Sequence, residues 1–361
     1  MDRNTSNSHR QKLVGRLGAF FLLFFGTISS VTSKVQLTIP SHGYAGIIHY
    51  FEKPGMQVFV MFFGMIFALP VGTCWGPNGP MDLKKFSLYQ WVIPVLNSVC
   101  ATVAIFINTV GLARINVSIF MMLRGSLSIF STLFSIIFLR KKFYHYQWLG
   151  IVMTIISLVI VGVAGVLMSD NTKENDDRFT WVDRLFGVLI VLVAQIIQGW
   201  QLVFDEYMTQ HLKLPVMLVV GMEGIWGCLI MIFIAFPFCF IIPGKDPSPF
   251  GGSLENVYDS LLMIGNSSTI LAITLVSCFA IGCFDIAGMT VTATMSSVHR
   301  TIFEALRTLT TWAVMLFIGL FSSSFGEHWC NWSWLELGGF ALLVCSSLIF
   351  NGVIHLPFFK Y

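Results

Sequence analysis

The sequence has 361 residues, of which 55% are hydrophobic and only 11% are charged, and its net charge is +3. Soluble domains carry about 25% charged residues, so this chain has too few charges to cover a water-exposed surface. The small net charge also argues against a nucleic-acid partner. The composition therefore indicates a polytopic membrane protein, whose lipid-facing surface needs almost no charged side chains.

Ten apolar segments are long enough to cross a bilayer, which takes about 20 residues per helix. They cover residues 17–33, 56–72, 89–111, 118–139, 148–167, 184–205, 215–241, 270–292, 302–321 and 334–355. Lipid offers no hydrogen-bond partners to an open backbone, so spans of this length must be helical. We therefore predict an all-α membrane protein with ten transmembrane helices.

The first apolar segment follows Arg10, Lys12 and Arg16, an arrangement that also occurs in signal peptides. It is long for the apolar part of a signal peptide, and no A-x-A-like cleavage site follows it. We expect this segment to be retained as the first transmembrane helix.

The distribution of Lys and Arg predicts the orientation, because cytosolic loops carry an excess of both. With a cytosolic N-terminus, twelve of the 21 basic residues lie on the cytosolic side and seven on the opposite side. Both termini are then cytosolic, as an even number of spans requires. Three of four N-x-[ST] sequons, at Asn116, Asn266 and Asn331 but not at Asn4, fall on the non-cytosolic side, which suits a secretory-pathway protein.

The two halves of the chain share a repeated sequence pattern. The pattern [ST]-I-F-x-x-L-R occurs at Ser118–Arg124 and again at Thr301–Arg307, with an offset of 183 residues. A unit of five helices used twice must enter the membrane from opposite sides, as in many secondary transporters. We predict a tail at 1–16, repeats at 17–168 and 184–355, a non-cytosolic linker at 169–183 and a tail at 356–361. Chance similarity between two apolar helices is the alternative.

Polar residues within the predicted spans are candidates for a transport path. An ionisable residue there costs at least ~2.5–3.5 kcal/mol on the insertion scale, so it should face a cavity or a partner. Arg124 is the clearest case, and Ser128, Ser131 and Ser135 share its helical face. This stripe could line a hydrated path, although serines also serve in helix packing.

Four more ionisable residues lie in the second half of the predicted bundle. Glu223 and Asp285 are lone carboxylates, and each could bind a cationic group, take up a proton or serve as a hydrogen-bonded packing residue. Glu304 and Arg307 are three residues apart in one helix, so they could line a site or pair with each other.

The sixth predicted helix has a polar face. Gln195, Gln198, Gln201 and Asp205 follow one another at helical spacing within an otherwise apolar segment. We interpret Asp205 and Glu206 as residues at the cytosolic interface that need no special role. Gln195 and Gln198 are candidates for solute binding.

Motifs for catalysis or metal binding are absent from the sequence. It has no phosphate loop, no G-x-S-x-G, no H-E-x-x-H and no C-x-x-C, and six of its eight Cys lie in apolar runs. We therefore expect no enzyme activity, no cofactor and no metal.

Several short stretches, in order along nearly the whole chain, carry a family resemblance. They include Phe51-Glu-Lys-Pro54, Met122-Leu-Arg-Gly125, Gln147-Trp-Leu-Gly150, Val220-Gly-Met-Glu-Gly224 and Phe284-Asp-Ile-Ala-Gly288. With them the chain resembles the drug/metabolite transporter superfamily and, within it, the F-type branch of the solute carrier 35 family. The resemblance implies EamA-type repeats, a ten-helix transporter and a lysosomal, Golgi or other endomembrane location.

These observations predict a secondary-active transporter of a small organic solute that works by alternating access, with proton coupling left open. A nucleotide-sugar exchanger and a non-transporting scaffold or receptor are the alternatives. The expected partners are the solute and the bilayer, and a homodimer stays open. The candidate substrate-binding or gating residues are Arg124, Gln195, Gln198, Glu223, Asp285, Glu304 and Arg307.

Overall fold

The computed structural model describes residues 2–36, 39–75, 82, 85–112, 123–124, 126–142, 144–169, 181–244, 246–247, 252–321, 332–350 and 354. Most of these residues are helical, and the strands among them form a single antiparallel pair. The fold is therefore that of an all-α membrane protein, as predicted.

The first half contains α1 (Asp2–Gln36), β1 (Pro40–His42), the 3-10 turn η1 (Tyr44–Gly46), β2 (Ile48–Tyr50), α2 (Pro54–Ile66), α3 (Ala68–Trp75), α4 (Leu88–Val92), α5 (Pro94–Leu112), α7 (Leu127–Leu139) and α8 (His145–Ser169). The second half contains α9 (Trp181–Glu206), the π-helical turn η3 (Tyr207–His211), α10 (Val216–Ile230), the π-helical turn η4 (Met231–Ala235), α11 (Phe236–Ile241), α12 (Val257–Asn266), α13 (Ser268–Thr294), α14 (Ser297–Phe321) and α15 (Ser333–Phe350).

Eight helical stretches among the described residues are long and apolar enough to cross a membrane. Each overlaps one of the predicted segments. The fourth and fifth predicted segments coincide instead with the shorter apolar helices Leu127–Leu139 and His145–Val161. Residues 118–122 of the fourth segment lie outside the described residues, as do the sequons at Asn116 and Asn331, most of the predicted linker and the predicted C-terminal tail.

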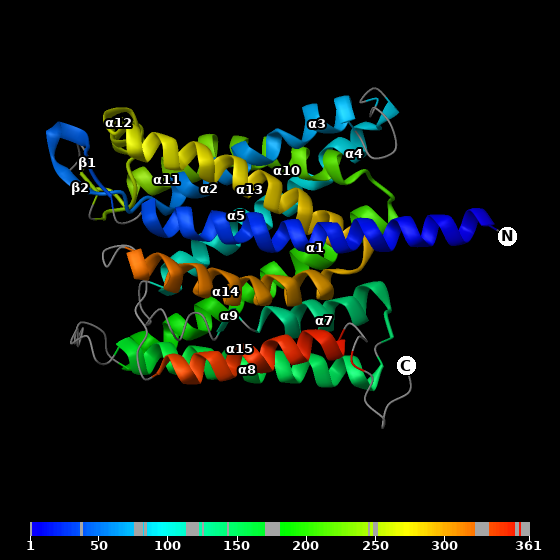
Figure 1. Cartoon of the computed structure of the whole chain (residues 1–361). Coiled ribbons are helices and arrows are strands. Elements are labelled where there is room, and N and C mark those ends of the chain that lie inside the picture. The colour runs from blue at the N-terminus through cyan, green and yellow to red at the C-terminus, as the bar shows by residue number, and fades with distance from the viewer. Residues whose placement is uncertain are drawn as a thin grey trace. The chain divides into compact units, whose positions relative to one another are not determined.

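The chain forms two compact units, and each takes helices from both halves of the sequence. Unit 1 comprises Met1–Ala19, Val103–Leu212 and Val291–Tyr361, and unit 2 comprises Phe20–Thr102 and Lys213–Thr290. Figure 1 shows the chain in sequence colours, with the helices labelled.

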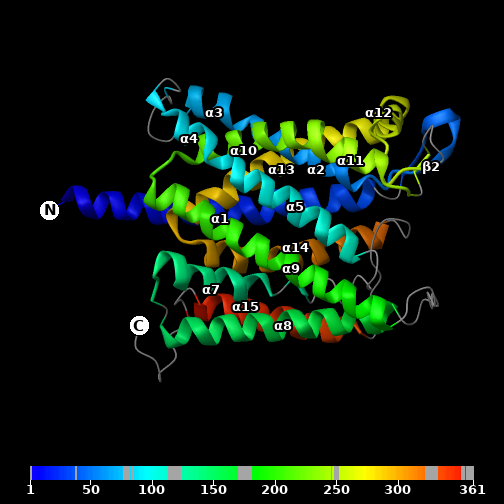
Figure 2. The same ribbon diagram turned by 180° about the vertical axis from the view of Figure 1, so that it is seen from behind.

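Within unit 1, close helix pairs form where small side chains let backbones approach. α8 lies along α15, with Gly150 against the backbone of Phe350 and with the hydroxyl oxygens of Thr154 and Ser346 2.9 Å apart (Figure 2). α9 meets α7 at Gly199, where a Cβ would lie 3.2 Å from the backbone nitrogen of Ser131. Such small-residue contacts are the usual basis of helix packing in membranes.

Within unit 2, α2 packs against α10 and α13 in the same manner. A Cβ on Gly224 of α10 would lie 2.7 Å from the carbonyl oxygen of Phe62, and one on Gly282 of α13 would lie 2.6 Å from that of Gly64. Pro54 occupies the first turn of α2, where its missing N–H leaves no hydrogen bond unmade. The glycines therefore fix α2 between two other spans.

One end of unit 2 carries the β1–β2 hairpin and α12. Ser41 pairs with His49 across the hairpin, and the Ser41 hydroxyl donates to the carbonyl oxygen of Met263 in α12 (3.0 Å). The polar side of the short helix α12 faces inward, since Asp259 is buried whereas Tyr258 and Leu261 are exposed.

Candidate functional site

The seven predicted site residues are divided between the two units. Arg124, Gln195, Gln198, Glu304 and Arg307 belong to unit 1, and Glu223 and Asp285 belong to unit 2. The surroundings of each residue are therefore considered within its own unit.

Gln195 is the most distinctive predicted residue of unit 1. Its side chain is fully buried on α9, and its Nε2 donates a hydrogen bond to the Oδ1 of Asn108 on α5 (3.1 Å). Its Oε1 has no hydrogen-bond partner among the described residues. Gln198, three residues further along α9, is half-buried. Buried acceptors are nearly always satisfied, so this oxygen needs a water or a ligand.

The predicted serine stripe of α7 faces the protein interior. Ser128, Ser131 and Ser135 are all buried, and the Ser135 and Ser297 hydroxyl oxygens are 3.2 Å apart. The Oγ of Ser131 has no hydrogen-bond partner among the described residues. Ser131 lies against Gly199, which is one turn beyond Gln195 on α9. The Ser131 Oγ and the Gln195 Oε1, which both lack a partner among the described residues, therefore come from adjoining helices. Arg124 does not continue this buried stripe, since its side chain is exposed.

A second group of residues joins the ends of α7, α9 and α14 in unit 1. Glu206 is fully buried at the end of α9, and its Oε2 accepts hydrogen bonds from the backbone nitrogen (3.1 Å) and the hydroxyl (2.8 Å) of Ser297. Its other carboxylate oxygen forms an ion pair with Lys141, just beyond α7. A carboxylate at a helix N-terminus stabilises the unpaired N–H groups there, so Glu206 anchors α14.

Arg300 extends this group along α14. Its Nε donates to the Oε1 of Glu304 (2.9 Å), and its Nη1 lies 3.3 Å from the Oδ2 of the buried Asp205. We refer to Lys141, Asp205, Glu206, Arg300 and Glu304 as the α14 network.

The α14 network changes one interpretation made from the sequence. Asp205 and Glu206, which we expected to need no special role, are buried and form ion pairs. Glu304 pairs with Arg300, one turn before it, and Arg307 is half-buried further along the helix. In the sequence, Lys141 and Arg300 carry no signal beyond their charge, which we used only for orientation.

In unit 2, Glu223 is a buried carboxylate with a specific partner. Its Oε1 accepts a hydrogen bond from the Nδ2 of Asn97 on α5 (2.7 Å), and its backbone carbonyl accepts one from the Ser98 hydroxyl (3.0 Å). Asn97 and Ser98 were not identified from the sequence. Asp285 is half-buried on α13. The geometry of Glu223 fits a packing role and leaves a binding role open.

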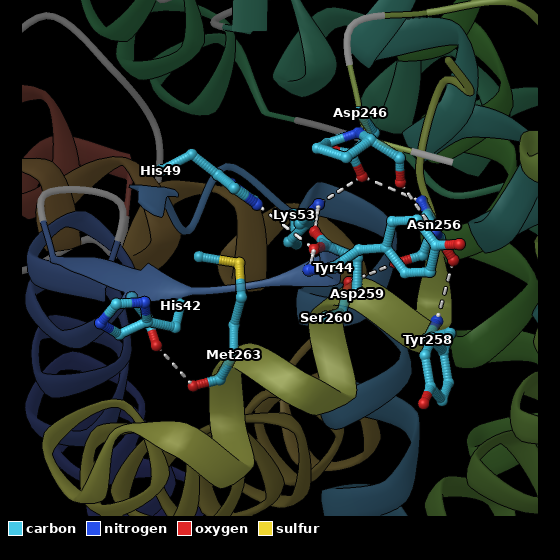
Figure 3. A network of polar contacts seen from close by, with 12 residues as sticks. His42, Tyr44, His49, Lys53, Asp246, Asn256, Tyr258, Asp259, Ser260 and Met263 are labelled. Atoms are coloured by element: carbon cyan, nitrogen blue, oxygen red, sulfur yellow. Dashed lines mark hydrogen bonds and ion pairs between the residues drawn. The ribbon is translucent and has the colours of Figure 1, made fainter. Parts of the chain in front are cut away.

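The densest polar cluster of unit 2 lies where α2 begins, and Figure 3 shows it from close by. The side chain of Lys53 is 0% exposed, and its amine pairs with the carboxylates of Asp259 (2.5 Å) and Asp246. Asp259 also accepts a hydrogen bond from the backbone nitrogen of Tyr44 (2.5 Å) and lies 3.3 Å from the Nε2 of His49. The cluster thus joins the hairpin, α12 and the residue before α2.

Glu255 completes this cluster. Its two carboxylate oxygens accept hydrogen bonds from the backbone nitrogens of Gly55 (2.6 Å) and Met56 (2.7 Å), so it caps the N-terminus of α2. A side chain at position 55 would collide with the carboxylate, because a Cβ there would lie 2.7 Å from the Glu255 Oε2. We refer to Lys53, Asp246, Glu255 and Asp259 as the α2 clasp.

The pKa values of two carboxylates of the clasp are shifted in opposite directions. Burial raises the pKa of Glu255 above its ordinary value, against the opposing effect of the two backbone hydrogen bonds and Lys53. Burial acts in the same direction on Asp259, but the Lys53 hydrogen bond and charge, the Tyr44 backbone N–H and His49 outweigh it, so the pKa of Asp259 is lowered. Among the described residues, no group of His, Cys, Asp and Glu is arranged to hold a metal ion.

Comparisons with known proteins find similar sequences among the solute carriers. No protein-family model matches the chain. The chain is 28% identical over 347 residues to solute carrier family 35 member F6 of Homo sapiens, covering 94% of this chain and 89% of the relative. The Mus musculus protein of the same name is 28% identical over 351 residues, at 95% and 90% coverage. An uncharacterized protein of Schizosaccharomyces pombe is 23% identical over 279 residues, at 77% coverage of both chains.

A solved crystal structure whose description names no function has a similar fold, with a TM-score of 0.58 at 12% identity and coverage of 96% and 97% of the two chains. The likeness to named relatives extends over almost the full length of both proteins and includes the membrane helices described above. The chain is an integral, multi-pass membrane protein that is similar over almost its whole length to members of the solute carrier 35 family.

Proposed function

We propose that this protein is a secondary-active transporter that moves a small organic solute across an endomembrane by alternating access. The observation that carries the proposal is the pair of buried polar atoms in unit 1, the Gln195 Oε1 and the Ser131 Oγ, that have no partner among the described residues. Inside a membrane such atoms are costly unless a water or a solute satisfies them. Similarity to a solute carrier family over almost the whole chain favours transport over catalysis.

We further propose ten transmembrane helices arranged as two inverted five-helix repeats. Helices at equivalent positions of the two predicted repeats pack together within the units: α7 with α14, α8 with α15 and α2 with α10. A twofold relation between the repeats would bring equivalent helices together in this way. Alternating access would then come from rocking of one repeat against the other.

The charge of the transported solute depends on which of the predicted residues line the transport path. Arg124 and Arg307 would hold an anionic group, whereas Glu223 and Asp285 would hold a cationic group or carry a coupling proton. Gln195 and Gln198 would contribute neutral hydrogen bonds in either case. The unsatisfied acceptor of Gln195 favours a solute that presents an N–H or O–H donor.

Solute flux into proteoliposomes under an imposed pH gradient tests this proposal. Nucleotide sugars, amino acids and organic cations would be screened as probes. Uptake that follows the pH gradient and is lost in Glu223→Gln would identify a proton-coupled carrier. Gradient-independent exchange of a nucleotide sugar that is lost in Arg124→Ala would identify an anion exchanger. Uptake no faster than in protein-free vesicles for every class of probe would favour the scaffold or receptor alternative.

A further inference from the structure

The α2 clasp buries more acids than bases. One cation, Lys53, pairs with the carboxylates of Asp246 and Asp259 (Figure 3), and its charge also acts on the carboxyl group of Glu255. The side chains of Lys53 and Asp259 are 0% exposed, and that of Asp246 is 15% exposed. Carboxylates that share one buried site disfavour each other's charged forms, so such a cluster is relieved when one of them binds a proton.

The contacts identify which carboxylate binds the proton. Asp259 is held in its charged form by Lys53, by the Tyr44 backbone N–H and by His49. Asp246 forms an ion pair with Lys53, and its Oδ2 accepts a hydrogen bond from the backbone nitrogen of Asn256 (2.9 Å). Among the described residues, the direct partners of Glu255 are the backbone N–H groups of Gly55 and Met56, so its negative charge is the least compensated of the three.

We propose that Glu255 is a proton-binding site that makes closure of the α2 clasp depend on pH, with the clasp closed most firmly in mildly acidic solution. The titratable or charged groups that act on this carboxyl group or on its neighbours are Lys53, Asp246, Asp259, His49 and the Cys239 thiol of α11. Among these groups, the negative charge of Asp246 acts directly on Glu255.

The direction of the pH effect follows from linkage between proton binding and closure. Because the pKa of Glu255 is raised in the closed clasp, the closed form binds this proton more tightly than an open, hydrated form. The resulting stabilisation is complete below the ordinary pKa of Glu255 and is lost as the pH rises through the raised value.

Asp259 determines how far the pH can fall before the clasp is weakened again. Its pKa is lowered, so its contribution is present above the ordinary pKa of an aspartate and is lost as the pH falls through the lowered value. Between these two limits Glu255 is protonated while Asp259 still holds Lys53. The net charge of the clasp is then smaller than at neutral pH, which is why mild acid favours closure.

Hydrogen exchange of the full-length protein in lipid nanodiscs tests the inference without any transported solute. Peptides covering the first turn of α2 would be followed from pH 4.5 to 7.5, with labelling times corrected for the intrinsic pH dependence of exchange. We expect protection of this turn to fall by about tenfold as the pH rises. Because no solute is needed, this result is independent of whether the proposed transport is correct.

Three variants make the test specific. Glu255→Gln should remove the pH dependence, whereas Glu52→Gln, which changes an exposed carboxylate two residues before Pro54, should keep the wild-type profile. Asp246→Asn should move the transition to lower pH, since it removes a negative charge that raises the pKa of Glu255. A flat wild-type profile, or a pH-dependent profile that survives in Glu255→Gln, would overturn the proposal. If Glu255→Gln does not fold, an unshifted transition in Asp246→Asn would do so.

Discussion

The α2 clasp of unit 2 and the α14 network of unit 1 share one local arrangement. Each places a buried carboxylate, Glu255 or Glu206, against the backbone N–H groups that begin a membrane helix. In each region, the carboxylate comes from a segment that is far in sequence from the helix it caps. The first N–H groups of a helix have no acceptor within the helix, so a carboxyl group from another segment can satisfy them in both regions.

The two regions differ in how their charges are balanced. The clasp has one base for three acids and excludes water from its lysine. The network has two bases, Lys141 and Arg300, for three acids, and the side chain of Lys141 is 27% exposed. A buried pair is costly to break because it leaves an unpaired charge, whereas a partly hydrated one is not. The comparison indicates that the clasp is a tight anchor and that the network is easier to open.

The largest effect should come from removing the cation of the clasp. Lys53→Met leaves Asp246 and Asp259 without their base, and we expect the free energy of unfolding to fall by about 3–5 kcal/mol. Denaturation in mixed detergent micelles would measure this change. Lys85→Met is the matched control, since Lys85 forms an exposed pair with Asp82 and should contribute little. Equal losses in the two variants would contradict the anchoring role of Lys53.

Breaking the network should cost less. Glu206→Gln removes the ion pair with Lys141 and weakens the hydrogen bonds to Ser297, and water can take over the solvation of the partly exposed lysine. We expect a loss of about 1–3 kcal/mol in the same denaturation assay. A loss as large as that of Lys53→Met would mean that the two regions do not differ in the way proposed.

The smallest of these effects concerns the space left for the Glu255 carboxylate. Gly55→Ala brings a Cβ against this carboxylate and should destabilise the protein by about 1–2 kcal/mol. Gly265→Ala in α12 is the control, because no atom lies within 4 Å of the added Cβ and alanine favours the helix. A neutral result at position 55 would show that the cap of α2 tolerates displacement.

The transmembrane segments could be predicted from the sequence because hydropathy alone determines them, and each predicted segment overlaps an observed helix. The buried serine stripe of α7 was also predictable, since helical spacing puts Ser128, Ser131 and Ser135 on one face. In both cases the signal is local in sequence.

The polar clusters could not be predicted, because their members lie far apart in the chain. Lys53 is separated from Asp246 by 193 positions and from Asp259 by 206, and each of these residues looks like an ordinary loop charge in the sequence. The ion pairs of Asp205 and Glu206 were missed for the same reason, since their partners Arg300 and Lys141 lie in other segments of the chain. Hydropathy identifies spans but carries no information about which charges meet after folding.

The most direct test of the transport proposal is the effect of Gln195→Leu on solute flux in proteoliposomes. The control is Thr154→Val, which alters an equally buried polar residue whose hydroxyl has partners in α8 and α15. We predict that Gln195→Leu lowers flux by about tenfold, the effect of losing about 1.4 kcal/mol of hydrogen bonding to the solute, while Thr154→Val transports normally per folded protein. Unchanged flux in Gln195→Leu would contradict the proposed path through unit 1.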